Sequence, residues 1–141
     1  MKAIMGIAGY SEIARMLGFN DVADEYATIA KKMAVKWEEM ANEGDHYRLA
    51  FDREDTWSQK YNMIWDKMWG LNLFPNNVID KEINYYLTKQ NPYGLPLDSR
   101  KDYTKSDWIM WTAAMSSDQI TFEKFVDPLY KYVNETISRV P

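Results

Sequence analysis

The pattern of apolar and polar positions along the chain predicts six helices of two kinds. Residues 2–17 are apolar almost all round, whereas residues 21–43 carry apolar side chains at every third or fourth position, with charged side chains between them. The first pattern is typical of a helix buried on more than one side, and the second of a helix with one exposed face. The same two patterns then alternate twice more, in the segments 58–72, 77–90, 106–116 and the segment after Asp118.

Several positions predict where these helices begin and end. Gly18 is typical of a helix C-terminus and Asn20-Asp21 of a start, and Thr56 or Ser58 could cap the helix near 58–72. Residues 104–107 have the character of a capping box, and Ser116–Asp118 end one helix and start the next. Two local structures stay open, because His46–Phe51 alternates weakly enough to be a short strand, and Pro128 either kinks the last helix or starts a new one capped by Asp127.

The alternation of the two helix kinds predicts an all-α fold. A buried helix followed by an amphipathic one occurs three times, at a spacing of roughly 50 residues, which is longer than common two-helix solenoid repeats. An inner, covered layer and an outer, half-exposed layer fit this order. We therefore expect residues 1–141 to form one helical domain, built as three αα-hairpins in a toroid or a short solenoid.

The links between the predicted helices differ in length, and this difference locates a candidate site. The links from an inner to an outer helix are short, whereas the two links from an outer to an inner helix, 45–57 and 91–105, are long and rich in polar and aromatic residues. Alternating helices place both long links on one face, and long ordered loops on a rigid scaffold commonly carry binding sites. Both links lead into helix N-termini, which favour anions.

Composition and charge exclude several classes of function. The 141 residues carry 17 Lys and Arg against 21 Asp and Glu, a net charge of −4, and no basic cluster, so we expect no nucleic-acid partner. The chain has no cysteine, which removes thiol catalysis and thiolate metal sites. The longest apolar run, 3–10, is too short for a membrane span, and the pattern after Met1-Lys2 lacks a cleavage site, so we expect neither a membrane partner nor a signal peptide in this chain.

The polar residues permit acid–base chemistry but give no motif for a cofactor. Carboxylates from two loops could serve as general acid and general base, although each could equally be a cap or a surface charge. Asn62, Asp66 and Trp69 lie on one stripe of a largely apolar helix, which could face a cavity or could pair locally. His46 is the single histidine and cannot form a multi-histidine metal site. No P-loop, dinucleotide or metalloprotease motif occurs, so we expect no cofactor and no metal.

Four stretches of the chain resemble the glutaminase A family. They are Lys2-Ala3-Ile4 with the Gly-containing helix, DHYRLAFD (45–52), TWSQKYNMIWDK (56–67) and LTKQNPYGLPLDSRKDYTKSDWIMWTA (87–113). The central domain of that family is similar to the six-hairpin glycosidase toroids, which are rings of twelve helices in two layers. The resemblance thus implies that the three hairpins of this chain are the C-terminal half of an (α/α)6 toroid in a longer protein.

The resemblance also implies an activity, namely hydrolysis of the side-chain amide of glutamine. A glycoside hydrolase on the same toroid, acting on a sugar, and a non-catalytic helical module are the alternatives, because one fold hosts many functions. Within the matched motifs we expect Asp98 or Asp66 to act as base for water and Arg100 to bind a substrate carboxylate. The further residues expected to bind a small-molecule substrate are Trp57, Gln59, Lys60, Trp69, Tyr103 and Asp107.

Half of a ring leaves its apolar inner layer exposed, which soluble proteins avoid. We therefore expect either the missing N-terminal half of the parent protein or a second copy of this chain to cover the layer. The resemblance further implies that the parent protein is exported, to the periplasm or outside the cell.

Overall fold

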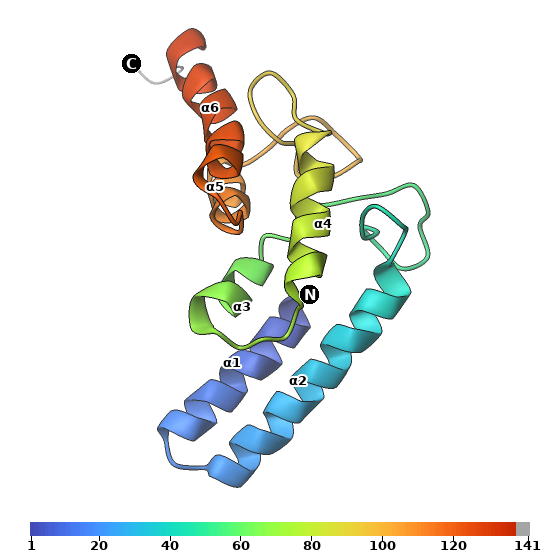
Figure 1. Ribbon diagram of the computed structural model, residues 1–141, viewed down its shortest axis with the longest axis vertical. Helices are drawn as coiled ribbons and strands as arrows, with labels where there is room; N and C mark the ends of the chain where they lie inside the picture. Colours follow the sequence, from blue (N-terminus) through green and yellow to red (C-terminus); the bar gives the residue numbers. More distant parts are fainter. Residues whose placement is uncertain (138–141) are drawn as a thin grey trace.

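The structure, a computed structural model, describes residues 1–137 and is helical throughout that range apart from the links. Figure 1 shows six helices joined by links of unequal length. Their bounds are α1 Lys2–Met16, α2 Asn20–Ala41, α3 Met63–Trp69, α4 Asn76–Leu87, α5 Ser106–Ala114 and α6 Gln119–Glu135. The predicted all-α class and the predicted order of helices are confirmed.

The first hairpin turns at a glycine. Gly18 has a φ of 83°, in the left-handed region that favours glycine. Its N–H donates to the carbonyl of Arg15 at 3.0 Å, and the N–H of Phe19 donates to the carbonyl of Ala14 at 2.9 Å. These two bonds form a Schellman motif, which satisfies carbonyls that the helix end would otherwise leave free. The chain then returns as α2, antiparallel to α1 (Figure 1).

The third hairpin turns at a capping side chain. Asp118 precedes α6, and its carboxylate accepts the backbone N–H of Thr121 at 2.9 Å, as an N-cap does. The predicted recapping at Ser116–Asp118 is thereby confirmed. Pro128 lies inside one continuous α6, so the alternative of a new helix capped by Asp127 is wrong.

The helices form the two predicted layers. α1 contacts α3 and α3 contacts α5, so the three inner helices lie in a row. α2 packs along α1 and α6 packs along α5 on the outer side, and α4 follows α3 after the link 70–75. Together they make three αα-hairpins.

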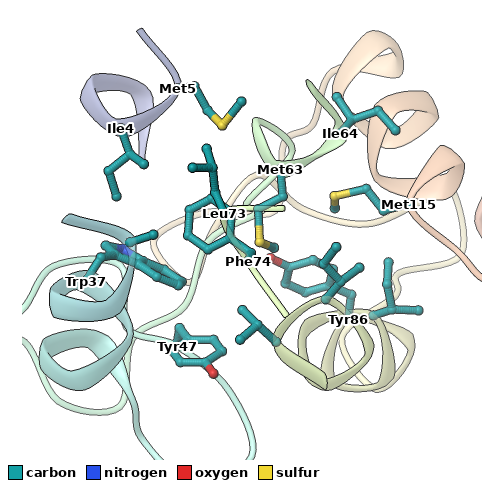
Figure 2. Close-up of a cluster of buried hydrophobic side chains, with 14 of the residues drawn as sticks. Ile4, Met5, Trp37, Tyr47, Met63, Ile64, Leu73, Phe74, Tyr86 and Met115 are labelled. Atoms are coloured by element: carbon teal, nitrogen blue, oxygen red, sulfur yellow. The ribbon is translucent and has the colours of Figure 1, made fainter. Parts of the chain in front are cut away.

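One apolar core joins the layers. Figure 2 shows Ile4 and Met5 of α1, Trp37 of α2, and Leu73 and Phe74 of the link 70–75 gathered in this core. Phe74 meets Trp37 edge-on, with ring centroids 5.6 Å apart, in the arrangement that aromatic pairs prefer. The core continues through α3, α4, α5 and α6 with Met63, Ile64, Val78, Ile83, Tyr86, Ile109, Met115 and Phe125.

Three local predictions are wrong, and all three concern the long links. His46–Phe51 forms no strand in the described residues, because its one bridge, between Tyr47 and Asn42, is isolated. α3 begins at Met63 rather than near 58, since the backbone of 57–59 bonds to the other long link, and neither Thr56 nor Ser58 caps it. The capping box is absent, because Lys105 precedes α5 and Thr104 donates its hydroxyl to the carbonyl of Leu95.

The helices of the inner row keep exposed apolar surface. Large apolar side chains are exposed on each of its helices, namely Tyr10, Ile13 and Met16 on α1, Met68 and Trp69 on α3, and Met110 on α5. An exposed apolar layer is what the sequence predicts for half of a ring. None of the helices within residues 1–137 combines the length and the apolar content that a bilayer crossing needs.

The close approach of Gly94 to the core predicts that two glycine substitutions have opposite effects on stability. Gly94 has a φ of 125°, and a Cβ added to it would lie 2.7 Å from the Cδ1 of buried Ile109. We expect Gly94→Ala to lower the free energy of unfolding by about 1–3 kcal/mol. The control is Gly6→Ala, where α1 leaves open space, and it should raise that free energy by about 0.5–1 kcal/mol. Urea denaturation measures both, and equal effects would contradict the prediction.

Candidate active-site cleft

The two long links lie together and are paired by their backbones. Ser58 forms an antiparallel bridge with Asp98, the N–H of Gln59 donates to the carbonyl of Leu97 at 2.9 Å, and the N–H of Ser99 donates to the carbonyl of Trp57 at 3.0 Å. Since these segments are about forty positions apart in the sequence, the pairing fixes one link against the other. The predicted gathering of both links at one face is confirmed.

A cleft of about 750 Å³ opens between the paired links and the N-terminal end of α1. Four lysine and arginine residues line it, against two aspartates, although the whole chain carries a net charge of −4. They are Lys2, Arg48, Lys60 and Arg100 on one hand and Asp52 and Asp98 on the other. A concave, locally positive surface concentrates anions, so the cleft suits a small ligand with a carboxylate.

Asp98 and Arg100 form one rigid pair at the wall of this cleft. The guanidinium donates from Nε to Oδ1 at 2.9 Å and from Nη2 to Oδ2 at 2.7 Å, and the backbone N–H of Arg100 donates to Oδ1 at 2.9 Å. These bonds hold the pKa of the Asp98 carboxyl below its ordinary value. The Asp98 side chain is largely buried, whereas the Arg100 side chain is 63% exposed.

Trp57 and Gln59, both predicted to bind substrate, are buried and already engaged. Trp57 packs against Tyr85 and Tyr86 of α4, with ring centroids 6.1 and 6.0 Å away. The amide of Gln59 donates to the carbonyls of Leu95 and Pro96, and its oxygen accepts the hydroxyl of Thr112 at 3.0 Å. Gln59 lines the cleft, but these bonds make it a support for the second link.

Lys60 lines the cleft and sends its Nζ into the protein. That atom lies 2.8 Å from the carbonyl of Tyr47, 3.0 Å from the carbonyl of Ser58 and 3.6 Å from a carboxylate oxygen of Glu82. Glu82 and Tyr86 were not predicted from the sequence. The available signal was that Glu82 falls on the buried face of α4, beside Ile79, Ile83 and Tyr86.

Asp66, the second predicted catalytic carboxylate, lies apart from Asp98. Its two oxygens accept the backbone N–H groups of Leu73, at 3.0 and 3.2 Å, and of Phe74, at 2.9 Å. It lines a separate pocket beside the link 70–75, together with Asp80. Its partners assign it a structural role, in which it fixes the turn between α3 and α4.

The remaining predicted residues also lie outside the cleft. Trp69 is 56% exposed on α3 and packs on Trp65, with centroids 5.7 Å apart. Tyr103 and Asp107 line a second groove of about 820 Å³, between the link 91–105 and α6. The structure therefore brings together Asp98, Arg100, Gln59 and Lys60, and separates them from Asp66, Trp69, Tyr103 and Asp107.

His46 lies in the first long link and contacts residues on either side of it. Its Nδ1 lies 2.7 Å from a carboxylate oxygen of Asp45, its Nε2 lies 3.3 Å from one of Glu43, and its ring stacks on Tyr85 at 4.2 Å. Glu43 also accepts the backbone N–H of Asp55 at 3.0 Å. Among residues 1–137, no three His, Asp or Glu side chains are arranged to hold a metal ion.

The fold and the cleft together define a helical-hairpin domain with a candidate small-molecule site. The model of the family described as the glutaminase A six helical-hairpin domain matches residues 1–141, and the chain belongs to this family. The chain is 34% identical to "Glutaminase A" of Aspergillus oryzae, over 140 residues that cover 96% of the chain and 20% of the relative. It is 30% identical to "Probable glutaminase/05536" of Arthroderma benhamiae over an alignment of 170 positions, which covers 100% of the chain and 20% of the relative.

The chain thus spans about a fifth of the length of these curated relatives. No solved structure matches it significantly. The resemblance predicted from the four sequence stretches is confirmed by the family match, and the family description counts six hairpins where residues 1–137 supply three.

The contacts of Asp66 predict the effect of removing its charge. We expect Asp66→Asn to lower the free energy of unfolding by about 1–3 kcal/mol, because an amide has one acceptor oxygen where the carboxylate has two, and its NH2 group would face one of the N–H donors of Leu73 and Phe74. Asp80→Asn, at an exposed carboxylate of the same pocket, is the matched control and should be near neutral. Urea unfolding curves decide, and equal stability of the two variants would rule out the structural role.

Proposed function

We propose that this chain forms part of an amidohydrolase that releases ammonia from the side-chain amide of glutamine, and that the cleft between the paired links is its active site. The observation that carries the proposal is the Asp98–Arg100 pair on the wall of a locally positive cleft. Membership of the glutaminase A family supports the substrate class.

Amide hydrolysis needs a base for water and a means to orient the substrate. Asp98 is the carboxylate of the cleft that is held in one orientation, and Arg100 keeps it ionised. A guanidinium carries five N–H groups and Asp98 takes two of them, so the exposed remainder of Arg100 can bind a substrate carboxylate. We assign Asp98 as base and Arg100 as both its anchor and a ligand for the substrate.

A glycoside hydrolase is the second candidate, and one observation favours it. Tyr61 and Trp108 stack at 4.0 Å between centroids beside the cleft, which also contains the two carboxylates Asp52 and Asp98. Glycoside hydrolysis commonly uses two carboxyl groups. Sugar binding that quenches tryptophan fluorescence, with no response to glutamine, would favour this activity over the first.

Two further proposals concern the protein around the chain. By family membership we propose that the parent protein is exported. For the chain by itself, we propose that a second copy covers the exposed inner face of α1, α3 and α5, because large apolar side chains are exposed on each of these helices.

Removal of the Asp98 charge tests the proposed active site. In the whole protein that contains this chain, we expect Asp98→Asn to lower the rate of ammonia release from glutamine by about 10²- to 10⁴-fold, the range typical of a lost general base. The matched control is Asp102→Asn, at an exposed aspartate of the same link, which should release ammonia at the wild-type rate. Full turnover in Asp98→Asn would exclude Asp98 from the reaction.

The mass of the chain in solution tests whether two copies form a dimer. Light scattering of the 141-residue chain should give twice its monomer mass of 16.7 kDa, and Ile13→Glu on the exposed face of α1 should shift the chain to monomer. Val35→Glu changes an equally exposed side chain on the outer helix α2, so it should leave the dimer intact. A wild-type monomer across the concentration series would refute this pairing.

A further inference from the structure

A buried polar cluster lies directly beneath the proposed active site. Glu82 and Tyr86 of α4 have no exposed surface, and Lys60 is 6% exposed. Figure 2 places Tyr86 and Tyr47 among the apolar side chains of the core. Charges in such surroundings are costly unless they are closely paired, so the position of each proton in this cluster matters.

The contacts of the Tyr86 hydroxyl constrain where the protons lie. The backbone N–H of Lys60 donates to this hydroxyl at 2.7 Å. The hydroxyl also lies 2.9 Å from the carbonyl oxygen of Ser58 and in hydrogen-bond contact with Oε2 of Glu82. These two oxygen–oxygen contacts need one proton each. Tyr86 supplies one proton and a carbonyl supplies none, so both contacts are hydrogen bonds only when Glu82 carries the second proton.

The contacts of Lys60 agree with this count. Its Nζ donates to the carbonyls of Tyr47 and Ser58, at 2.8 and 3.0 Å, and lies 3.6 Å from Oε2 of Glu82, beyond hydrogen-bond distance. Two donors are what a neutral amine has. Burial in the core raises the pKa of Glu82 and lowers the pKa of Lys60, which is the same direction.

We infer that Lys60 and Glu82 form a neutral pair, and that Glu82 and Tyr86 are positioning residues of the cleft. In this pair protonated Glu82 donates to the hydroxyl of Tyr86, and Tyr86 donates to the carbonyl of Ser58. The positioning role of Glu82 and Tyr86 rests on the proposed function, whereas the neutral state of the Lys60–Glu82 pair does not. Oε1 of Glu82 accepts the N–H of Tyr47 at 2.7 Å, so the same carboxyl group also holds the first link.

The positioning follows from the backbone groups that the cluster binds. Tyr86 holds both the carbonyl of Ser58 and the N–H of Lys60, which flank Gln59. The segment 57–59 is paired in turn with 97–99, where Asp98 lies. The hydroxyl of Tyr86 therefore holds the backbone of the first link, and the first link holds the backbone around the proposed base Asp98.

Infrared spectroscopy tests the protonation directly. At pH 7 the wild-type chain should show the carbonyl stretch of a protonated carboxylic acid, and Glu82→Gln should lose it. Glu39→Gln, at an exposed glutamate of α2, should keep it. Absence of this band from the wild type would overturn the inference. The pair holds one proton in either its neutral or its ionic form, so a pH titration of stability would not distinguish the two.

Stability gives a second and independent test. The amide of Glu82→Gln can donate to Tyr86 and accept from Tyr47, as a protonated carboxyl does, so the unfolding equilibrium constant should change by less than about tenfold. Glu82→Ala leaves both partners unsatisfied and should change it by about a hundredfold. A change of about a thousandfold in Glu82→Gln would reveal an ammonium left without its partner, and hence an ionic pair.

Hydrogen exchange tests the positioning. In Tyr86→Phe the amide protons of Gln59 and Ser99, which form the pairing between the links, should exchange at least about tenfold faster relative to the amide of Ala23 in the first hairpin. Equal acceleration of all three would mean a general loss of stability and would overturn the positioning role. None of these measurements needs turnover, so a protein without glutaminase activity would refute the proposed function and leave standing the neutral pair and its hold on the link backbone.

Discussion

Within residues 1–137 the two long links form isolated backbone bridges but no sheet, and three carboxylates supply acceptors for backbone N–H groups that the bridges leave over. Glu82 takes the N–H of Tyr47, Glu43 that of Asp55, and Asp98 that of Arg100. Tyr47 is buried, and a buried backbone donor left without a partner would cost about as much as a lost hydrogen bond. These carboxylates therefore act together with the backbone pairing of 57–59 and 97–99 to fix the path of the links. The cleft exists because that path is fixed.

The helices could be predicted because each of them follows from local periodicity. The apolar spacing in 21–43 and the apolar run in 2–17 required no knowledge of distant residues, and Gly18 and Asp118 mark ends by rules that act within one turn. The start of α3 could not be predicted in this way. Residues 58–62 have a helical pattern, but the partner that holds 57–59 extended is 97–99, which no local rule identifies.

The residues of the candidate site also differ in whether local sequence alone could predict their roles. The sequence placed Asp98 and Arg100 in a long link, and the structure places them at the cleft, because loop position is a local property. Asp66 has the same side chain as Asp98, yet its oxygens are taken up by Leu73 and Phe74, which follow a turn that the sequence did not describe in atomic terms. Glu82 was missed for the converse reason: a charged residue on an apolar face looks like a break in the pattern until its partners are known.

The pairing with Arg100 controls how strong a base the Asp98 carboxylate could be. A carboxylate that accepts three hydrogen bonds is well oriented but weakly basic, because each bond stabilises the ionised form. Its basicity would rise if Arg100 turned toward a substrate carboxylate, since two of the three bonds come from the guanidinium and that side chain is mostly exposed. Substrate binding and base activation would then be one event, and only a ligand with an anionic group could trigger it. A neutral sugar would leave the guanidinium on Asp98, so under the proposed function this pair suits an amino-acid amide better than a glycoside.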